Sequence, residues 1–227
     1  MLHQTQVPRV ADAWPDFIRR FPTPAAAVAA GPGAVIEAWG RLGYPRRARW
    51  LYEAAVVIDA NGWPDDLTEL PGVGRYTAGA IAAQADDADV AAVEVNVQRV
   101  LERVAGRRLT VREAETEMLR VGGDLGGRDR LLALMDVGAV LCRLREPRCD
   151  ECPLRRQCAS RGPRPGEHDD RRRQSRFEGS FRQRRGRVLG ALRRGAEPVS
   201  SLDADALASL VADRLAVVDG DRARLPD

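Results

Sequence analysis

All four cysteines of this 227-residue chain lie in one short segment, CRLREPRCDECPLRRQC. They are Cys142, Cys149, Cys152 and Cys158, with the spacing C-x6-C-x2-C-x5-C. A loop this short can bring four thiolates onto one metal centre, and Pro147 and Pro153 stiffen it. A [4Fe-4S] cluster and a zinc ion both take four thiolates, but zinc ribbons usually have two C-x2-C pairs and this segment has one. Unrelated free thiols are the third interpretation.

The composition predicts a mostly α protein with one sizeable core and a small appendage. Hydrophobic residues make up 44% of the chain, alanine-rich stretches with helical spacing dominate, and no long alternating run suggests a sheet. No signal peptide is visible, nor is an apolar run long enough to span a membrane. We therefore expect a cytoplasmic protein without a membrane partner.

All 36 basic residues are arginine, and the net charge is +3. A GC-rich genome that favours arginine codons would explain this bias. Whatever its origin, the absence of lysine excludes covalent chemistry through a lysine Schiff base. Arginine still provides forked donors for phosphate groups.

A glycine-flanked turn joins two segments with helical spacing, 46–60 and 76–84. It reads LPGVGRYTA, from Leu70 to Ala78, and its two glycines flank Val73. Such a turn exposes backbone N–H groups at the start of the second helix, where they can donate to a phosphate. The alternative is an ordinary tight connection between helices.

Taken together, these motifs resemble the MutY-type adenine DNA glycosylases of the helix-hairpin-helix superfamily. The resemblance runs from Met1 to about Cys158 and includes the cluster loop. It rests further on MLHQTQV (1–7), WGRLGYPRRA (39–48), LPGVGRYTAGAIA (70–82), VEVNVQRVLERV (93–104) and LMDVGAVLC (134–142). It implies a helix-hairpin-helix glycosylase fold, a [4Fe-4S] cluster on the four cysteines, and removal of adenine mispaired with guanine or 8-oxoguanine.

The resemblance also implies catalytic residues. Glu94 matches the family's essential aspartate of a D-x-N-V segment and would stabilise positive charge on the deoxyribose, with Asn96 orienting the site. A solvated glutamate at a helix start is the alternative. Tyr76 stands where endonuclease III-type enzymes carry a catalytic lysine, which implies a monofunctional enzyme. Its ring either contacts DNA or packs in the core.

A monomer contacting duplex DNA with a mismatched or damaged base is expected, associated with the nucleoid. Gln4 and Tyr44 match residues that wedge into the duplex in the family. Tyr44 as plain packing is the alternative. The hairpin residues expected at the DNA are Leu70, Gly72, Val73, Gly74, Arg75 and Thr77.

The family's general acid is a glutamate two residues before the segment with which this sequence begins. Either the chain starts upstream of Met1, or it is truncated or diverged; His3 is a weak candidate for a substitute acid. Two other functions stay open. One is a thymine or uracil glycosylase acting on G mismatches, and the other is a catalytically impaired DNA-binding protein.

The expected domain ranges are 1–134 for the glycosylase domain, 135–160 for the cluster region, 161–186 for a basic linker and 187–227 for a small winged-helix-like module. Within that module we expect helices at 187–194 and 202–213. A hairpin over 215–225 is expected to turn at Gly220 and Asp221.

Overall fold

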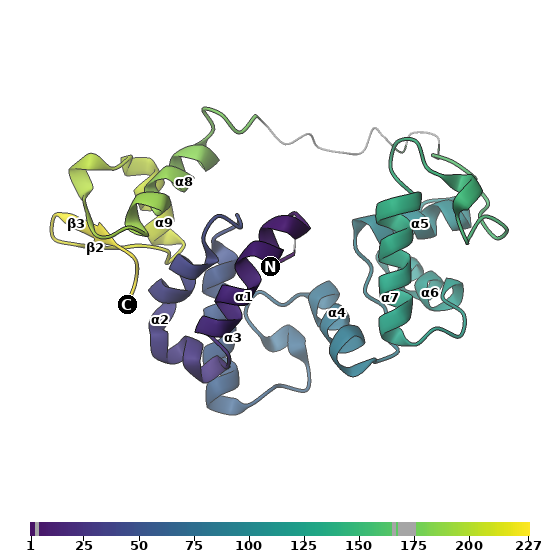
Figure 1. Cartoon of the computed structure of the whole chain (residues 1–227), viewed down its shortest axis with the longest axis horizontal. Coiled ribbons are helices and arrows are strands. Elements are labelled where there is room, and N and C mark those ends of the chain that lie inside the picture. Colours follow the sequence, from purple (N-terminus) through teal and green to yellow (C-terminus); the bar gives the residue numbers. More distant parts are fainter. Residues whose placement is uncertain (3–4, 165–166, 168–175) are drawn as a thin grey trace. The chain divides into compact units, whose positions relative to one another are not determined.

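The computed structural model describes residues 1–2, 5–164, 167 and 176–227, so the predictions for His3 and Gln4 lie outside the described residues. The fold is mostly helical, as predicted, and forms two compact units (Figure 1). The discontinuous unit comprises Met1–Gly72 and Gln174–Asp227, and the continuous unit comprises Val73–Arg173. None of the helices among the described residues is long and apolar enough to cross a membrane.

The discontinuous unit combines elements from both ends of the chain. Its first part contains α1 (Val7–Arg20), α2 (Pro24–Trp39), α3 (Arg46–Asn61) and the 3-10 helix η1 (Leu67–Glu69). Its second part contains α8 (Phe181–Leu192), β1 (Glu197–Pro198), η4 (Val199–Ser201), α9 (Ala204–Ala212), β2 (Val217–Asp219) and β3 (Arg222–Arg224). Both parts share one apolar core, in which Ile36 of α2 belongs to the same cluster as Leu210 and Leu215.

This shared core differs from the expected domain ranges. Residues 1–134 were expected to form one domain, with 187–227 as a separate module. The structure instead groups the C-terminal elements with α1–α3, because their apolar faces are buried together. Helix α2 bends at Gly31, where φ is +81°, directly before Pro32, whose ring cannot continue a helix ladder.

The C-terminal elements follow the predicted order of helix, helix and hairpin. Antiparallel strands lie in the order β1-β3-β2, and the β2–β3 hairpin turns at Gly220, where φ is +58°. Helix α8 starts at Phe181, inside the range expected as linker, because the Ser180 side chain accepts a bond from the Gln183 N–H and caps the first turn.

The continuous unit is built from shorter helices. They are α4 (Arg75–Asp86), α5 (Val95–Ala105), α6 (Val111–Val121), α7 (Gly127–Asp136), the π-helical turn η2 (Val137–Leu141) and the 3-10 helix η3 (Cys149–Glu151). Leu101, Met118 and Leu131 lie in its core. Thr110 and Glu113 form a capping box at the start of α6. Helix α5 is the central element, because it carries residues directed at both the candidate active site and the cysteine loop.

Candidate active site and cysteine loop

Glu94 lies immediately before α5 and caps it. Its Oε1 accepts from the Val97 backbone N–H at 2.9 Å, and its Oε2 accepts from Asn96 Nδ2 at 3.1 Å. The half-buried carboxylate is thus held on both oxygens, yet each oxygen keeps a lone pair for another partner. The helix-start glutamate and the candidate catalytic carboxylate are therefore compatible descriptions of one residue.

Tyr76, in the first turn of α4, lies near this carboxylate. Burial raises the pKa of the Tyr76 hydroxyl, and the charge of Glu94 raises it further. The phenol therefore stays protonated, and it is half-buried within electrostatic range of the carboxylate. The structure thus brings together the three predicted catalytic residues, Glu94, Asn96 and Tyr76.

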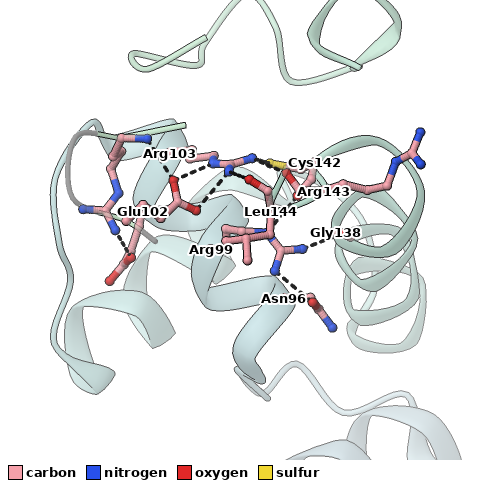
Figure 2. A network of polar contacts seen from close by, with 10 residues as sticks. Asn96, Arg99, Glu102, Arg103, Gly138, Cys142, Arg143 and Leu144 are labelled. Atoms are coloured by element: carbon pink, nitrogen blue, oxygen red, sulfur yellow. Dashed lines mark hydrogen bonds and ion pairs between the residues drawn. The ribbon is translucent and has the colours of Figure 1, made fainter. Parts of the chain in front are cut away.

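Asn96 is held in turn by Arg99, as Figure 2 shows. Arg99 Nη1 donates to Asn96 Oδ1 at 2.9 Å, Nη2 donates to the Gly138 carbonyl at 2.7 Å, and Nε donates to the Cys142 carbonyl at 2.8 Å. Hydrogen bonds therefore run from the Glu94 carboxylate to the backbone of the first cysteine. Sequence reasoning did not single out Arg99.

Gly138 allows η2 to approach the start of α5 closely. A Cβ at this position would lie 3.0 Å from Asn96 Cβ and 3.1 Å from the Asn96 carbonyl oxygen. Both contacts are tighter than ordinary van der Waals distance, so Gly138 permits this approach of η2 to the residue that orients Glu94.

Arg103, one turn further along α5, is 1% exposed and organises the cysteine loop (Figure 2). Its Nη1 donates to Cys142 Sγ at 3.3 Å and to the Arg143 carbonyl at 2.9 Å, and its Nη2 donates to the Leu144 carbonyl at 3.1 Å. Glu167 pairs with the same guanidinium at 2.9 Å. Burial lowers the pKa of Arg103, but Glu167 and Cys142 outweigh it and raise the pKa overall, so the guanidinium stays charged.

The four cysteines line one cavity together with Arg103. Burial raises the pKa of the Cys149 and Cys152 thiols, and the neighbouring cysteines raise it further, so a cationic centre would favour their thiolates. Across residues 1–2, 5–164, 167 and 176–227, no group of three or more His, Cys, Asp or Glu side chains is arranged to hold a metal ion. Four cysteine thiols around one cavity are the kind of ligand set that a [4Fe-4S] cluster takes.

The glycine-flanked turn has the expected backbone. Gly72 has φ +77°, and a Cβ there would lie 2.7 Å from Trp50 Cβ, so only glycine fits. Gly74 precedes α4 and makes no side-chain cap, and the N–H groups of the first turn of a helix point away from the helix body.

The predicted hairpin side chains differ in their access to solvent. Leu70 is 4% exposed and packs inward, so its side chain is not available to a ligand. The exposed Arg75 pairs with Glu115 at 2.9 Å. Val73 and Thr77 are half-buried. The hairpin therefore offers mainly backbone groups.

Tyr44, between α2 and α3, is 45% exposed and adopts φ +46°, which is rare for residues other than glycine. The Arg47 guanidinium lies 4.5 Å from the centre of its ring. The Thr5 hydroxyl donates to the Leu42 carbonyl at 2.9 Å and ties the N-terminal segment to this loop. Because of this exposure, the Tyr44 ring is not packed in the core.

Comparison with known proteins places this architecture in a family. The profile of the HhH-GPD superfamily base excision DNA repair proteins matches residues 1–121. The chain belongs to this superfamily. Among its HhH-GPD relatives, the adenine DNA glycosylase of Mycolicibacterium smegmatis is 40% identical over 218 residues, which cover 91% of this chain and 74% of the relative.

A second HhH-GPD relative is the adenine DNA glycosylase of Mycobacterium tuberculosis. It is 42% identical over 219 residues, covering 90% of this chain and 71% of the relative. A solved structure of a thermostable thymine-DNA glycosylase has a TM-score of 0.63 at 26% identity. That match covers 70% of this chain and 79% of the other. These matches confirm the resemblance and the fold inferred from the sequence.

Proposed function

We propose that this chain is a monofunctional adenine DNA glycosylase that hydrolyses the N-glycosidic bond of adenine opposite guanine or 8-oxoguanine. The observation that carries the proposal is the Glu94 carboxylate, which Val97 and Asn96 hold by hydrogen bonds within electrostatic range of Tyr76. The two mycobacterial relatives with high identity, both named adenine DNA glycosylase, favour adenine as the base.

Glu94 acts on the sugar in this mechanism. Loss of the base builds positive charge on the deoxyribose, and a fixed carboxylate stabilises that charge more strongly than mobile water does. Asn96 keeps the carboxylate in one orientation, since it donates to Oε2. Tyr76 contributes no amine for attack on the sugar, so water is the final nucleophile and an abasic site is the product. In the overall balance, water supplies the hydroxyl group that C1′ of the sugar gains and the proton that the departing adenine carries.

In this proposal, backbone N–H groups at the start of α4 bind the DNA backbone. The N–H groups that open α4 after Gly74 donate to a phosphate, and the helix dipole favours the negative charge. The exposed Tyr44 ring enters the base stack, where an aromatic wedge helps to extrude the target base.

The cysteine loop would hold a [4Fe-4S] cluster. Cys142, Cys149, Cys152 and Cys158 would be its ligands, as they line one cavity. When bound, the cluster would supply a rigid cross-link within the loop. Arg103 holds the loop from the side of α5, because it donates to Cys142 Sγ and to two loop carbonyls.

Base release from defined duplexes tests the function. Single-turnover assays on A·8-oxoguanine, A·G, T·G and U·G duplexes should rank adenine substrates first. A thymine or uracil glycosylase would invert that order; this alternative is included because the fold is similar to that of the thymine-DNA glycosylase structure. No release from any duplex would leave the protein as a DNA-binding protein without this activity.

Glu94→Gln tests the catalytic carboxylate. The amide keeps the size but loses the charge, so base release should fall by about 100-fold or more while duplex binding persists. Asp203→Asn is the matched control, because Asp203 caps α9 in the same way, accepting from the Ala206 N–H at 2.9 Å. Equal loss in both variants, or full activity of Glu94→Gln, would exclude this role for Glu94.

Iron and sulfide analysis tests the cluster. The purified protein should contain iron and acid-labile sulfide in equal amounts and absorb broadly in the visible range, and Cys149→Ser should lower all three. A colourless protein with stoichiometric zinc would contradict the cluster assignment.

A further inference from the structure

The C-terminal elements have no role in the function proposed above, yet they contact the helix that follows Tyr44. Asp213, directly after α9, has a side chain that is only 10% exposed. Its two oxygens take one arginine each: Arg46 Nη2 lies 2.6 Å from Oδ1, and Arg185 Nη2 lies 2.5 Å from Oδ2. Burial raises the pKa of Asp213, but the two arginines outweigh it and lower the pKa overall, so the carboxylate stays ionised.

Arg46 is the first residue of α3 and follows Tyr44 by two positions. The loop 40–45 before it has an unusual backbone, because Gly40, Gly43 and Tyr44 all have positive φ. Such a conformation at a tyrosine persists only when the surroundings fix it. Trp39 Nε1 donates to the Gly43 carbonyl at 2.8 Å on the α2 side, and the Arg46–Asp213 pair holds the α3 side.

A second link attaches the same face of α3 to the segment after α9. Glu53 accepts from Arg49 at 3.0 Å on its own helix and pairs with Arg214 at 3.1 Å. Positions 46, 49 and 53 lie on one face of a helix. Asp213 and Arg214, directly after α9, therefore hold α3 at its first turn and again two turns later.

The hairpin tip argues against a direct DNA contact by the C-terminal elements. Asp219 and Asp221 flank Gly220, and both are exposed. Arg222 beside them donates to the Ala196 carbonyl. Two carboxylates at the tip repel the phosphate backbone, whereas nucleic-acid-binding hairpins present basic residues.

We propose that Asp213 is a positioning residue that fixes the Tyr44 loop through Arg46, so that the C-terminal elements support the DNA wedge instead of binding DNA. The proposal rests on the proposed function for the role of Tyr44. The anchoring of the loop itself does not depend on that role.

Hydrogen exchange in the free protein tests the anchoring. Asp213→Asn should speed exchange of the amides in loop 40–45 and the first turn of α3. Asp205→Asn should not, although Asp205 also lies on α9, because its side chain is 80% exposed and lies 3.7 Å from Arg184. Arg46→Gln removes the same ion pair but leaves Asp213 paired with Arg185. This variant replaces Asp213→Asn in the experiment if Asp213→Asn does not fold. Unchanged loop exchange in the folded variant would overturn the proposal.

A double-mutant cycle with Tyr44→Leu tests the link to DNA. Asp213→Asn should weaken binding to an A·8-oxoguanine duplex by up to about fivefold, because Arg46 is partly solvated and such pairs contribute modestly. In the Tyr44→Leu background the same substitution should have no further effect. Additive losses would overturn positioning through Tyr44. If Tyr44→Leu alone leaves binding unchanged while Asp213→Asn loosens the loop, the wedge role fails and the anchoring stands.

Discussion

Gly138 determines how closely η2 approaches the residue that orients Glu94. Gly138→Ala places a methyl group 3.0 Å from Asn96 Cβ, so the start of α5 must shift by a few tenths of an ångström. Because catalysis depends on the placement of the carboxylate, we expect base release to fall by about tenfold while binding changes little. Single-turnover kinetics on an A·8-oxoguanine duplex measure this.

Gly186→Ala in α8 is the control for that substitution. A Cβ there meets nothing within 4 Å, so alanine should leave base release unchanged and favour the helix slightly. Full activity of Gly138→Ala would mean that the close approach at Asn96 does not matter to the chemistry.

The family resemblance pointed to Glu94 and Asn96 through one motif and to Tyr76 through the hairpin motif, but it did not point to Arg99 or Arg103. Arginines on an amphipathic helix are ordinarily expected at the solvated face. Both are buried here because carbonyls far along the chain, those of Gly138 and Cys142 for Arg99, satisfy their donors. These carbonyl partners can be identified only from the structure, which packs the segment after α7 against α5.

At the scale of elements, Gly33 allows α2 to pack closely against residues 225–226, which follow β3. A Cβ at Gly33 would lie 2.1 Å from the Pro226 carbonyl oxygen and 3.3 Å from Leu225 Cβ. Gly33→Ala must therefore displace the strand end or the helix, and we expect a loss of about 1–3 kcal/mol in the free energy of unfolding. Urea unfolding measures it.

Gly190→Ala provides the comparison, because this helical glycine has open space around it. It should be neutral or slightly stabilising. If Gly33→Ala unfolds at the same urea concentration as Gly190→Ala, the close packing of α2 against residues 225–226 does not contribute to stability.

The element boundaries that the sequence missed have a physical reason. The first turns of α8 carry several arginines, which resemble a solvated linker, and its buried residues, Val188, Leu189 and Leu192, all lie toward its end. The start is set by the Ser180 cap, a signal weaker than an apolar stripe. The β2–β3 hairpin was predicted correctly because its glycine turn and flanking residues are local signals.

At the scale of the whole molecule, the absence of lysine limits the chemistry. With no lysine among the 36 basic residues, no lysine Schiff base can form with the abasic sugar. We therefore expect base release to leave the DNA strand intact until alkali is added, and borohydride to trap no covalent complex. A denaturing gel, run with and without alkali, measures this. Strand cleavage without alkali would contradict it.

The composition predicted a helical protein, and the motifs predicted its family, but neither predicted which segments share a core. The expected domains followed chain order, with 187–227 as a separate module. Burial does not follow chain order here, since Leu210 and Leu215 complete the core around Ile36. Alternation and periodicity report which face of an element is apolar, not which distant element covers it.

A core assembled from both ends of the chain also affects the order of events during translation. The continuous unit, Val73–Arg173, is complete in sequence before the discontinuous unit receives its last segment. Segments leave the ribosome in chain order, and contacts between distant residues form late. Helices α1–α3 leave the ribosome before the continuous unit, yet their apolar face stays uncovered until α8, α9 and the β2–β3 hairpin follow. The core of the discontinuous unit is therefore completed after the continuous unit has left the ribosome.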